Sequence, residues 1–303
     1  MADDTASEGP GAAKSRFPPW IRKRIPAGNG VSSVQGMLRQ LGLATVCASA
    51  HCPNLHECFH RGTATFLIMG SVCTRACWFC AIEQADPGPL REDEPKAVAE
   101  ACARLGLRHV VITSVTRDDL PDGGAAHYVR TIQAVRARLP SAVIEVLVPD
   151  FQGSTEAIAT VLDAQPEIFN HNVETVPRLY QEVRPAADYR RSLDVLGQAR
   201  RLAGEKGLDL WTKSGLMVGL GETAGEIRAV LHDLRAAGCD IVTIGQYLAP
   251  SAEHAPVARF VKPAEFAAWE TEARTMGFAA VASAPFVRSS YHADQVFERR
   301  ERG

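Results

Sequence analysis

The stretch Ala64 to Cys80, ATFLIMGSVCTRACWFC, joins a short apolar run to three closely spaced cysteines. Residues 64–70 are apolar apart from Thr65, which favours a buried strand bounded by the glycine at its end. Cys73, Cys77 and Cys80 follow directly in a CxxxCxxC spacing. The sequence therefore predicts a cysteine-bearing loop at the carboxyl end of a strand, which is where α/β folds carry their active sites.

The rest of the chain repeats the alternation of apolar, β-branched runs with amphipathic helical stretches. Further strands are expected at 109–115, 142–148, 167–173, 210–220 and 240–248. Helices are expected to begin near Pro95, Ala125, Ser154, Ser192 and Thr223. Parallel strands joined by helical crossovers satisfy this pattern. The prediction is an α/β fold, a partial (β/α)6 TIM-type barrel, although a doubly wound open sheet has the same periodicity.

The chain divides into four parts on composition. Residues 1–16 are predicted to be a disordered tail, because they are rich in small and acidic residues. Residues 17–62 form an N-terminal extension, 63–250 the barrel, and 251–303 a C-terminal helix with a final polar segment. The prolines and cations of Phe17 to Pro26 favour a solvated arm over an arm docked on the body.

Composition excludes several classes of protein. The 303 residues carry a formal net charge of −2, so no overall basic field recruits nucleic acid. No apolar run approaches the ~20 residues that span a bilayer. The N-terminus contains acidic residues and no apolar core, unlike a secretory signal. We therefore expect a cytoplasmic protein that binds neither membrane nor nucleic acid.

The eight cysteines are unevenly distributed, since six of them lie between Cys47 and Cys80. A reducing compartment disfavours a disulfide scaffold, and crowding of this kind indicates metal or cluster ligation. Cys102 and Cys239 stand apart, and for them we expect the role of small buried hydrophobes.

The two cysteine triplets suit iron–sulfur clusters. Three thiolates on a cluster of four irons leave one iron open to an exogenous ligand. Trp78 and Phe79, before the last cysteine of the later triplet, are expected to shield such a cluster from water. The earlier triplet is CASAHCPNLHEC, with Cys47, Cys52 and Cys58. Zinc remains the alternative for both, as a Cys3His set in the earlier triplet, although neither triplet shows paired CxxC knuckles.

The later triplet, with an aromatic before its last cysteine, resembles the motif of radical S-adenosylmethionine enzymes. That resemblance implies a 4Fe–4S cluster whose unique iron chelates the amino and carboxylate groups of S-adenosylmethionine. Reduction would then cleave the sulfonium to methionine and a 5′-deoxyadenosyl radical.

Two further motifs narrow the resemblance to the lipoyl synthase family. They are the earlier triplet and RSSY at residues 288–291. The family resemblance implies a second 4Fe–4S cluster completed by Ser290, which donates sulfur to C6 and C8 of an octanoyl-lysine. It also implies octanoylated carriers as partners, namely 2-oxoacid dehydrogenase acyltransferase subunits and the glycine-cleavage carrier protein. Ferredoxin or flavodoxin is the implied reductant.

Polar residues at the ends of the predicted strands are candidate contacts for S-adenosylmethionine. The set comprises Thr113, Ser114, Glu145, Asn172 and Lys213. Arg117 and the two adjacent carboxylates are also expected at the barrel mouth, where the amino group of the cofactor would need acceptors such as carboxylates. Strand ends are polar in any barrel, so a purely structural role stays open for each. The arginines of 184–196 suit a bound carboxylate, an acidic partner surface or exposure to solvent on a helix.

Three other functions remain open from the sequence. A radical enzyme that forms a different product, such as a biotin synthase-like or methylthiolating enzyme, would share the later triplet. It would lack the earlier triplet and the RSSY motif. A zinc-structured binding protein would be non-catalytic. A nucleic-acid binder is the least supported, because the chain has no basic stripe.

Overall fold

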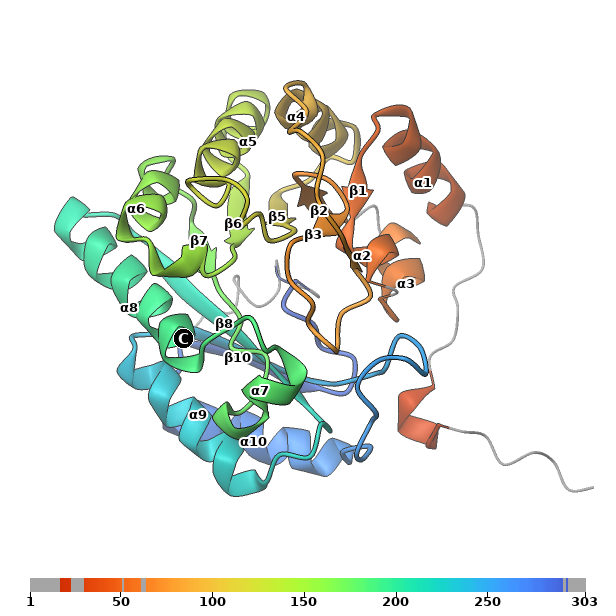
Figure 1. The fold of residues 1–303 in the computed structure, drawn as a ribbon, viewed down its shortest axis with the longest axis vertical. Coiled ribbons are helices and arrows are strands. Elements are labelled where there is room, and N and C mark those ends of the chain that lie inside the picture. The colour runs from red at the N-terminus through yellow and green to blue at the C-terminus, as the bar shows by residue number, and fades with distance from the viewer. Residues whose placement is uncertain (1–16, 23–29, 51, 61–63, 291–292, 294–303) are drawn as a thin grey trace, which may run out of the picture.

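The computed structural model describes residues 17–22, 30–50, 52–60, 64–290 and 293, and its centre is an eight-stranded sheet (Figure 1). The strand order is β1–β2–β5–β6–β7–β8–β9–β10. From β2 to β10 all neighbours are parallel, while β1 is antiparallel to β2. The strands are β1 Ala44–Thr45, β2 Thr65–Ile68, β5 His109–Ser114, β6 Val143–Leu147, β7 Ile168–Asn170, β8 Trp211–Val218, β9 Ile241–Gln246 and β10 Ala280–Ala284.

The six predicted strands are confirmed, and they add to the sheet in chain order. A doubly wound sheet would instead reverse its order at a switch point, so that alternative is wrong. In the described residues no pairing joins β10 to β1, so the barrel is partial, as predicted. One parallel strand was not expected. It is β10, whose sequence AVASA pairs residue by residue with β9 although four of its five residues are Ala or Ser.

Helices cover the outside of the curved sheet (Figure 1). Ser154 caps α6 through its hydroxyl, and Thr223 with Glu226 forms a capping box at α9, as their residue types predict. The helix predicted near Ser192 begins earlier, because Asp188 accepts the backbone N–H of Arg191. The helices are α4 Glu94–Arg104, α5 Ala125–Arg138, α6 Thr155–Asp163, α8 Tyr189–Lys206, α9 Ala224–Ala236 and α10 Pro263–Thr275.

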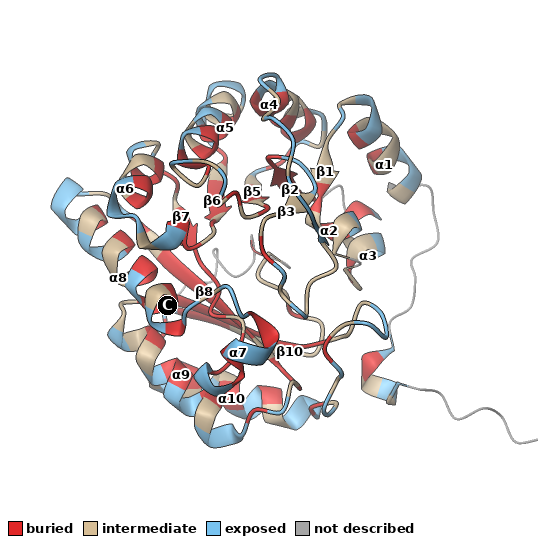
Figure 2. Cartoon of the chain, in the orientation of Figure 1, coloured by how far each residue is buried: buried red, intermediate tan, exposed pale blue. Residues whose placement is uncertain are grey.

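The core lies between the strands and the inner faces of these helices (Figure 2). Side chains of successive strands, among them Phe66, Ile112 and Phe169, are fully buried in it. The N-terminal extension contributes Leu38 and Phe59 to the same core cluster. Its helices are α1 Gly30–Gln40, α2 Val46–Ser49 and α3 Leu55–His60. The extension therefore shares its apolar core with the barrel.

The described part of the N-terminal arm is docked, so the expectation of a solvated arm is wrong for residues 17–22. Trp20 donates its indole N–H to the carbonyl of Val261 at 3.0 Å. The ring of Phe17 stands edge-on to Phe260, with centroids 5.7 Å apart. The tail predicted at 1–16 lies outside the described residues.

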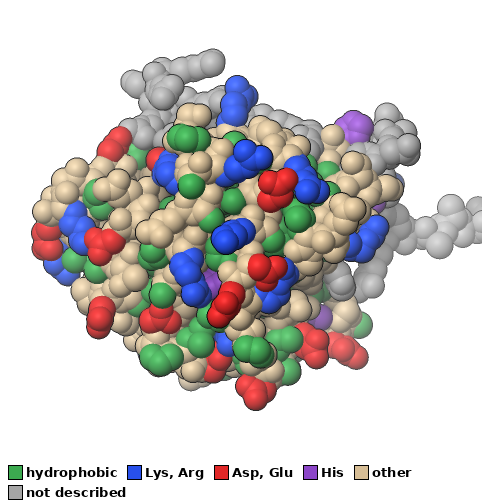
Figure 3. All heavy atoms as spheres, turned by 90° about the horizontal axis from the view of Figure 1, so that it is seen from above, with side chains coloured by type: hydrophobic (Ala, Val, Ile, Leu, Met, Phe, Trp, Pro, Cys, Tyr) green, Lys and Arg blue, Asp and Glu red, His purple; other side chains and the backbone are tan. Residues whose placement is uncertain are grey.

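The surface carries mixed charge. Figure 3 looks down on the top of Figure 1 and shows Lys and Arg side chains interspersed with Asp and Glu. Arg104 and Arg138, from α4 and α5, both pair with Glu100. No described helix is both long and apolar enough to cross a bilayer.

Candidate active site

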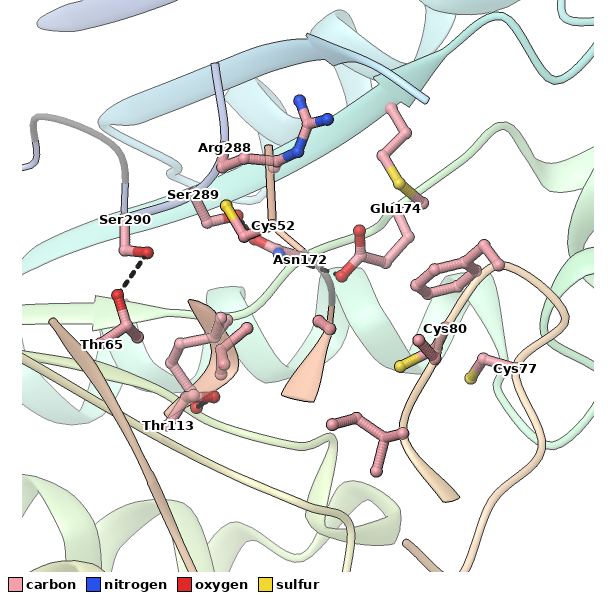
Figure 4. A pocket seen from close by; sticks show the side chains of 18 of the residues that line it. Cys52, Thr65, Cys77, Cys80, Thr113, Asn172, Glu174, Arg288, Ser289 and Ser290 are labelled. Atoms are coloured by element: carbon pink, nitrogen blue, oxygen red, sulfur yellow. Dashed lines mark hydrogen bonds between the residues drawn. The ribbon is translucent and has the colours of Figure 1, made fainter. Parts of the chain in front are cut away.

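A cavity of about 460 Å³ opens at the carboxyl ends of the barrel strands, and we call it the central cavity. Five of the six crowded cysteines line it, and Figure 4 shows three of them together with the serines of the C-terminus. The lining also includes apolar side chains such as Phe79, Ile82 and Leu216. A concave, largely apolar site with few polar groups is the usual form of a small-molecule site.

Residues 69–82, here called the cysteine loop, carry Cys73, Cys77 and Cys80 to the wall of the central cavity. The loop leaves β2 through two left-handed residues, Met69 at φ 67° and Gly70 at φ 94°. Cys73 ends the short strand β3, Val72–Cys73, which pairs with β4, Glu83–Gln84. The prediction of a cysteine loop directly after the first barrel strand is confirmed.

The surroundings of the later triplet suit metal-bound thiolates. The backbone N–H groups of Arg75 and Thr116 point at the Cys73 sulfur, at 3.5 and 3.4 Å. Burial raises the pKa of Cys77, and it raises the pKa of Cys80 to about 12. These buried thiols are therefore neutral on their own at pH 7, and a bound metal is what would deprotonate them.

The donor set fits a cluster better than a single ion. Among the described side chains, no three of His, Cys, Asp or Glu converge closely enough for one metal ion. A cubane of four irons separates its ligands more widely, and three soft thiolates are its usual ligands. Cys73, Cys77 and Cys80 around one cavity therefore fit an iron–sulfur cluster with an open iron.

Arg75, the middle one of the three residues between Cys73 and Cys77, anchors the cysteine loop. Arg75 pairs with Asp118, which follows β5, and with Asp150, which follows β6. Arg117 pairs with Asp119 and donates to the carbonyls of Met69 and Gly88.

These partners contradict one expectation. Neither Asp118 nor Asp119 lines the central cavity, so they do not offer acceptors there. Each is engaged by an arginine that holds the loop.

A second brace comes from the residues after β9. The backbone N–H of Ala255 donates to the carbonyl of Trp78, and the indole N–H of Trp78 donates to Glu253. His254 donates Nε2–H to the carbonyl of Cys80 at 3.2 Å. Trp78 is 41% exposed, so it does not shield the site as expected. Phe79, the next residue, does line the central cavity.

The earlier triplet lies across the cavity from the cysteine loop. Cys47 is in α2, Cys52 in the following turn and Cys58 in α3. Cys47 and Cys52 line the central cavity, while Cys58 is not among the lining residues. Burial, with a smaller contribution from the neighbouring Cys52 and Cys58, raises the pKa of Cys47 to about 12. Of the histidines that a Cys3His zinc site would use, His56 is exposed and residue 51 lies outside the described residues.

Residues 285–290, here called the C-terminal segment, bring the RSSY motif into the central cavity. Ser290 accepts a hydrogen bond from the Thr65 hydroxyl at 2.7 Å (Figure 4), and Thr65 in turn bonds to Cys47. Asn54, between Cys52 and Cys58, donates to the carbonyl of Phe286 at 2.7 Å. Ser290 therefore lies beside the earlier triplet. The last residue of RSSY, at position 291, is outside the described residues.

The predicted strand-end contacts separate into two groups. Thr113, Ser114 and Asn172 line the central cavity. Glu145 and Lys213 do not. They are 0% and 1% exposed inside the barrel, where Lys213 Nζ lies 2.8 Å from Glu145 Oε1. They are therefore paired with each other and do not face the cavity as expected.

Two further lining residues each have a buried atom without a hydrogen-bond partner among the described residues. They are His171, which was not singled out from the sequence, and Arg184, one of the arginines expected to suit a carboxylate. His171 donates Nδ1–H to Val148, and its Nε2 is unpaired. Burial lowers its pKa to about 4, so the ring is neutral and Nε2 is an acceptor. Arg184 donates Nη1–H to two carbonyls, and its Nε–H is unpaired. His171 directly follows β7, and this position at the end of a strand is the signal that could have identified it from the sequence.

Comparison with known proteins agrees with this geometry. The model of the radical SAM superfamily matches residues 67–234. A model described as the N-terminal domain of lipoyl synthase of the radical SAM family matches residues 4–52. Among solved structures, a maturase of the FeFe-hydrogenase (HydG) is similar with a TM-score of 0.57 at 13% identity, over 84% of this chain and 67% of that one. Methylornithine synthase is similar with a TM-score of 0.51 at 15% identity, over 77% and 70%. At these identities the solved structures support the fold alone.

Curated relatives are much closer in sequence. The chain is 55% identical to the lipoyl synthase of Caldanaerobacter subterraneus subsp. tengcongensis over 92% of this chain and 96% of the relative. It is 54% identical to the lipoyl synthase of Methylococcus capsulatus, over 93% and 87%. Similarity at this level over nearly the whole of both chains shows the family: the chain belongs to the lipoyl synthase family of the radical SAM superfamily.

Proposed function

We propose that this chain inserts two sulfur atoms, at C6 and C8, into an octanoyl group that is amide-linked to a lysine of a carrier domain. The observation that carries the proposal is that both cysteine triplets contribute to one cavity. Cys73, Cys77 and Cys80 line one side of it, and Cys47 and Cys52 line the other. A radical site and a sulfur source that share the central cavity suit direct transfer of sulfur to the substrate. The names of the curated relatives point the same way.

We assign two iron–sulfur clusters and the cosubstrate S-adenosylmethionine to the central cavity. Cys73, Cys77 and Cys80 would hold a 4Fe–4S cluster whose open iron binds S-adenosylmethionine. Cys47, Cys52, Cys58 and Ser290 would hold a second 4Fe–4S cluster. When bound, these groups supply a hydrogen-abstracting carbon radical and the sulfur. Unactivated C–H bonds have no useful acidity, so acid–base side chains alone would not perform this reaction.

The polar residues that line the central cavity would bind and orient S-adenosylmethionine, and we call them the cosubstrate wall. Arg184 has an N–H available for a carboxylate, and His171 Nε2 is an acceptor for a hydroxyl or ammonium N–H. The Thr113 hydroxyl donates to the Leu147 carbonyl and also has a side-chain hydrogen bond with Tyr128, so toward the cosubstrate its oxygen would act as an acceptor. We assign Ser114 and Asn172 to the same wall.

The apolar part of the lining would receive the octanoyl chain. It includes Phe79, Ile82, Leu216 and Met217. Side chains of this kind exclude water and offer a radical few alternative partners.

The stoichiometry of the reaction determines which partner proteins it requires. Two C–H bonds break and two C–S bonds form, with two molecules of S-adenosylmethionine consumed and electrons supplied by ferredoxin or flavodoxin. The acceptors are octanoylated lipoyl carrier domains, namely the acyltransferase subunits of 2-oxoacid dehydrogenases and the glycine-cleavage carrier protein. We place the protein in the cytoplasm, where these carriers and reductants meet.

The test is anaerobic turnover of an octanoyl-lysine peptide with S-adenosylmethionine and dithionite, followed by mass spectrometry. The expected product carries two added sulfurs. Iron and acid-labile sulfide are measured on the same preparation, and two clusters of four irons predict about eight of each. Zinc in a colourless protein would contradict the proposal.

Two variants separate the roles of the triplets. Cys77→Ala should abolish cleavage of S-adenosylmethionine, because the radical cluster loses a ligand. Cys52→Ala should retain cleavage and lose thiolated product, because only the sulfur source is damaged. Lipoyl groups made at normal yield by Cys52→Ala would refute the donor assignment.

A further inference from the structure

The two serines of the C-terminal segment bond to opposite sides of the central cavity. Ser290 is bonded to Thr65 beside the earlier triplet. Ser289, its neighbour, donates its hydroxyl to Asn172 Oδ1 at 2.9 Å (Figure 4). One short stretch of chain therefore bridges the proposed sulfur source and the wall assigned to S-adenosylmethionine.

The hydrogen bonds continue beyond Asn172. Its Nδ2 donates to Glu174 Oε1 at 3.0 Å, so a single buried amide accepts from Ser289 and donates to Glu174. An amide has distinct donor and acceptor ends, and a flip would lose both bonds. Ser289 thereby fixes the orientation in which Asn172 holds the carboxyl group of Glu174.

Glu174 needs such support. It lines the central cavity, burial raises its pKa, and its φ of 63° is a left-handed value that costs a non-glycine residue energy. Its backbone is held by Gly215, which accepts from the N–H of Glu174 at 3.0 Å, and by Met217, whose N–H donates to the carbonyl of Glu174 at 2.8 Å. Its side chain depends on Asn172 for its only hydrogen bond recorded among the described residues.

The sheet leaves space for this chain of bonds at a glycine. A Cβ on Gly215 would lie 2.7 Å from both Asn172 Oδ1 and Ser289 Oγ. Any larger residue at this point of β8 would push the two groups apart. The close approach of Ser289 to Asn172 is therefore provided for by the strand beneath it.

We infer that Ser289 is a positioning residue that couples the seating of the C-terminal segment to the binding of S-adenosylmethionine. It acts through Asn172 and Glu174. When the C-terminal segment occupies this position, Asn172 and Glu174 are ordered and the affinity for S-adenosylmethionine is high. By linkage, bound cosubstrate should hold the segment, and with it Ser290, in place. The inference rests on the proposed function, which assigns that wall to S-adenosylmethionine and Ser290 to the second cluster.

The experiment measures equilibrium binding of S-adenosylmethionine to the reconstituted, unreduced holoenzyme, with no octanoyl substrate. Ser289→Ala should weaken binding about five- to tenfold, the effect of one neutral hydrogen bond. Ser289→Thr retains the hydroxyl and should bind within about twofold of the parent. Iron content should equal that of the parent in both variants.

Ser283→Ala is the matched control. Its hydroxyl donates to the Phe266 carbonyl and does not line the central cavity, so binding should be unchanged. A reciprocal readout is the rate at which a chelator removes the iron of the second cluster, which saturating S-adenosylmethionine should slow in the parent and in Ser283→Ala but not in Ser289→Ala.

The inference is overturned if Ser289→Ala binds as tightly as the parent, or if cosubstrate protects its iron equally well. Failure of the proposed function would look different. The parent would still bind S-adenosylmethionine and respond to Ser289→Ala, yet would yield no thiolated peptide.

Discussion

Arg75 and Asp150 form a two-pronged ion pair behind the cysteine loop, with Nη1 to Oδ2 at 3.0 Å and Nη2 to Oδ1 at 2.7 Å. The same guanidinium also contacts both oxygens of Asp118, at 2.6 and 2.8 Å. Burial alone would raise the pKa of Asp150, but hydrogen bonds from Arg75 and its charge hold that pKa at about 2. One side chain thus ties the loop to the ends of β5 and β6.

We expect Arg75→Lys to release the later triplet. A lysine is a point charge that cannot reach two carboxylates in this forked geometry, so at least one of Asp118 and Asp150 would lose its bonds to residue 75. Asp150 would keep its ion pair with Arg191 at 3.3 Å, whereas Asp118 would lose its arginine. Iron content should fall by about half, because one of two clusters is lost, and cleavage of S-adenosylmethionine should fall with it. Arg178→Lys is the control, since Arg178 is exposed and pairs with Glu226. Full iron and normal cleavage in Arg75→Lys would refute the role of this clamp.

The clamp illustrates what the sequence could and could not predict. The cysteine triplets were predictable because their members are contiguous and their spacing alone indicates a loop. The partners of Arg75 were not, because Asp118 and Asp150 lie 43 and 75 residues away and only the sheet brings them together. The adjacent carboxylates of 118 and 119 were therefore predicted to face a ligand, when each faces an arginine.

The same limit applies inside the barrel. Glu145 and Lys213 sit on predicted strands, but the pleat decides which residues face the cavity and which meet across the interior. Strand β10 was missed for a different reason. Its small residues carry weak strand preference, and its pairing with β9 comes from tertiary contact. Periodicity predicted which segments form strands and helices, whereas the order of the strands in the sheet and the partners of individual side chains required the fold.

A second prediction concerns the buried pair of Lys213 and Glu145. Burial alone would raise the pKa of Glu145, but the charge of Lys213 and a hydrogen bond from His109 lower it to about 2. Lys213→Met leaves a buried carboxylate without its cation and should lower the free energy of unfolding by about 3–5 kcal/mol.

The double variant Lys213→Met with Glu145→Gln should recover much of that loss, since no buried charge remains unpaired. Anaerobic denaturant unfolding of the parent, both single variants and the double variant measures the coupling. Additive losses in the double variant would show that the pair does not interact as the geometry indicates.

A third prediction concerns the docked N-terminal arm. Trp20→Ala removes the hydrogen bond to Val261 and the ring that packs there, so the arm should detach. Limited proteolysis should then cleave the N-terminal part of the chain faster, while iron content stays that of the parent. Arg22→Ala is the control, because Arg22 lies on the same arm and its side chain donates to the exposed carbonyl of Phe17 at 3.4 Å. Equal cleavage rates for Trp20→Ala and the parent would contradict docking.

The last prediction concerns Gly245 in β9, over which the C-terminal segment passes. A Cβ at this position would lie 2.1 Å from the carbonyl oxygen of Val287 and 3.0 Å from its carbon. Both are backbone atoms, so the segment would have to move. We expect Gly245→Ala to displace the segment and weaken the bond between Thr65 and Ser290.

The consequence should be the opposite of that of Arg75→Lys. Gly245→Ala should lose the iron of the earlier triplet, retain cleavage of S-adenosylmethionine and yield no thiolated peptide. Gly204→Ala is the matched control, because Gly204 lies within helix α8 with nothing within 4 Å of its added Cβ. That change should leave activity unaltered and stabilise the helix by about 0.5–1 kcal/mol. If Gly245→Ala keeps the iron content of the parent and yields thiolated peptide at the parent's rate, the assignment of the C-terminal segment to the earlier triplet is wrong.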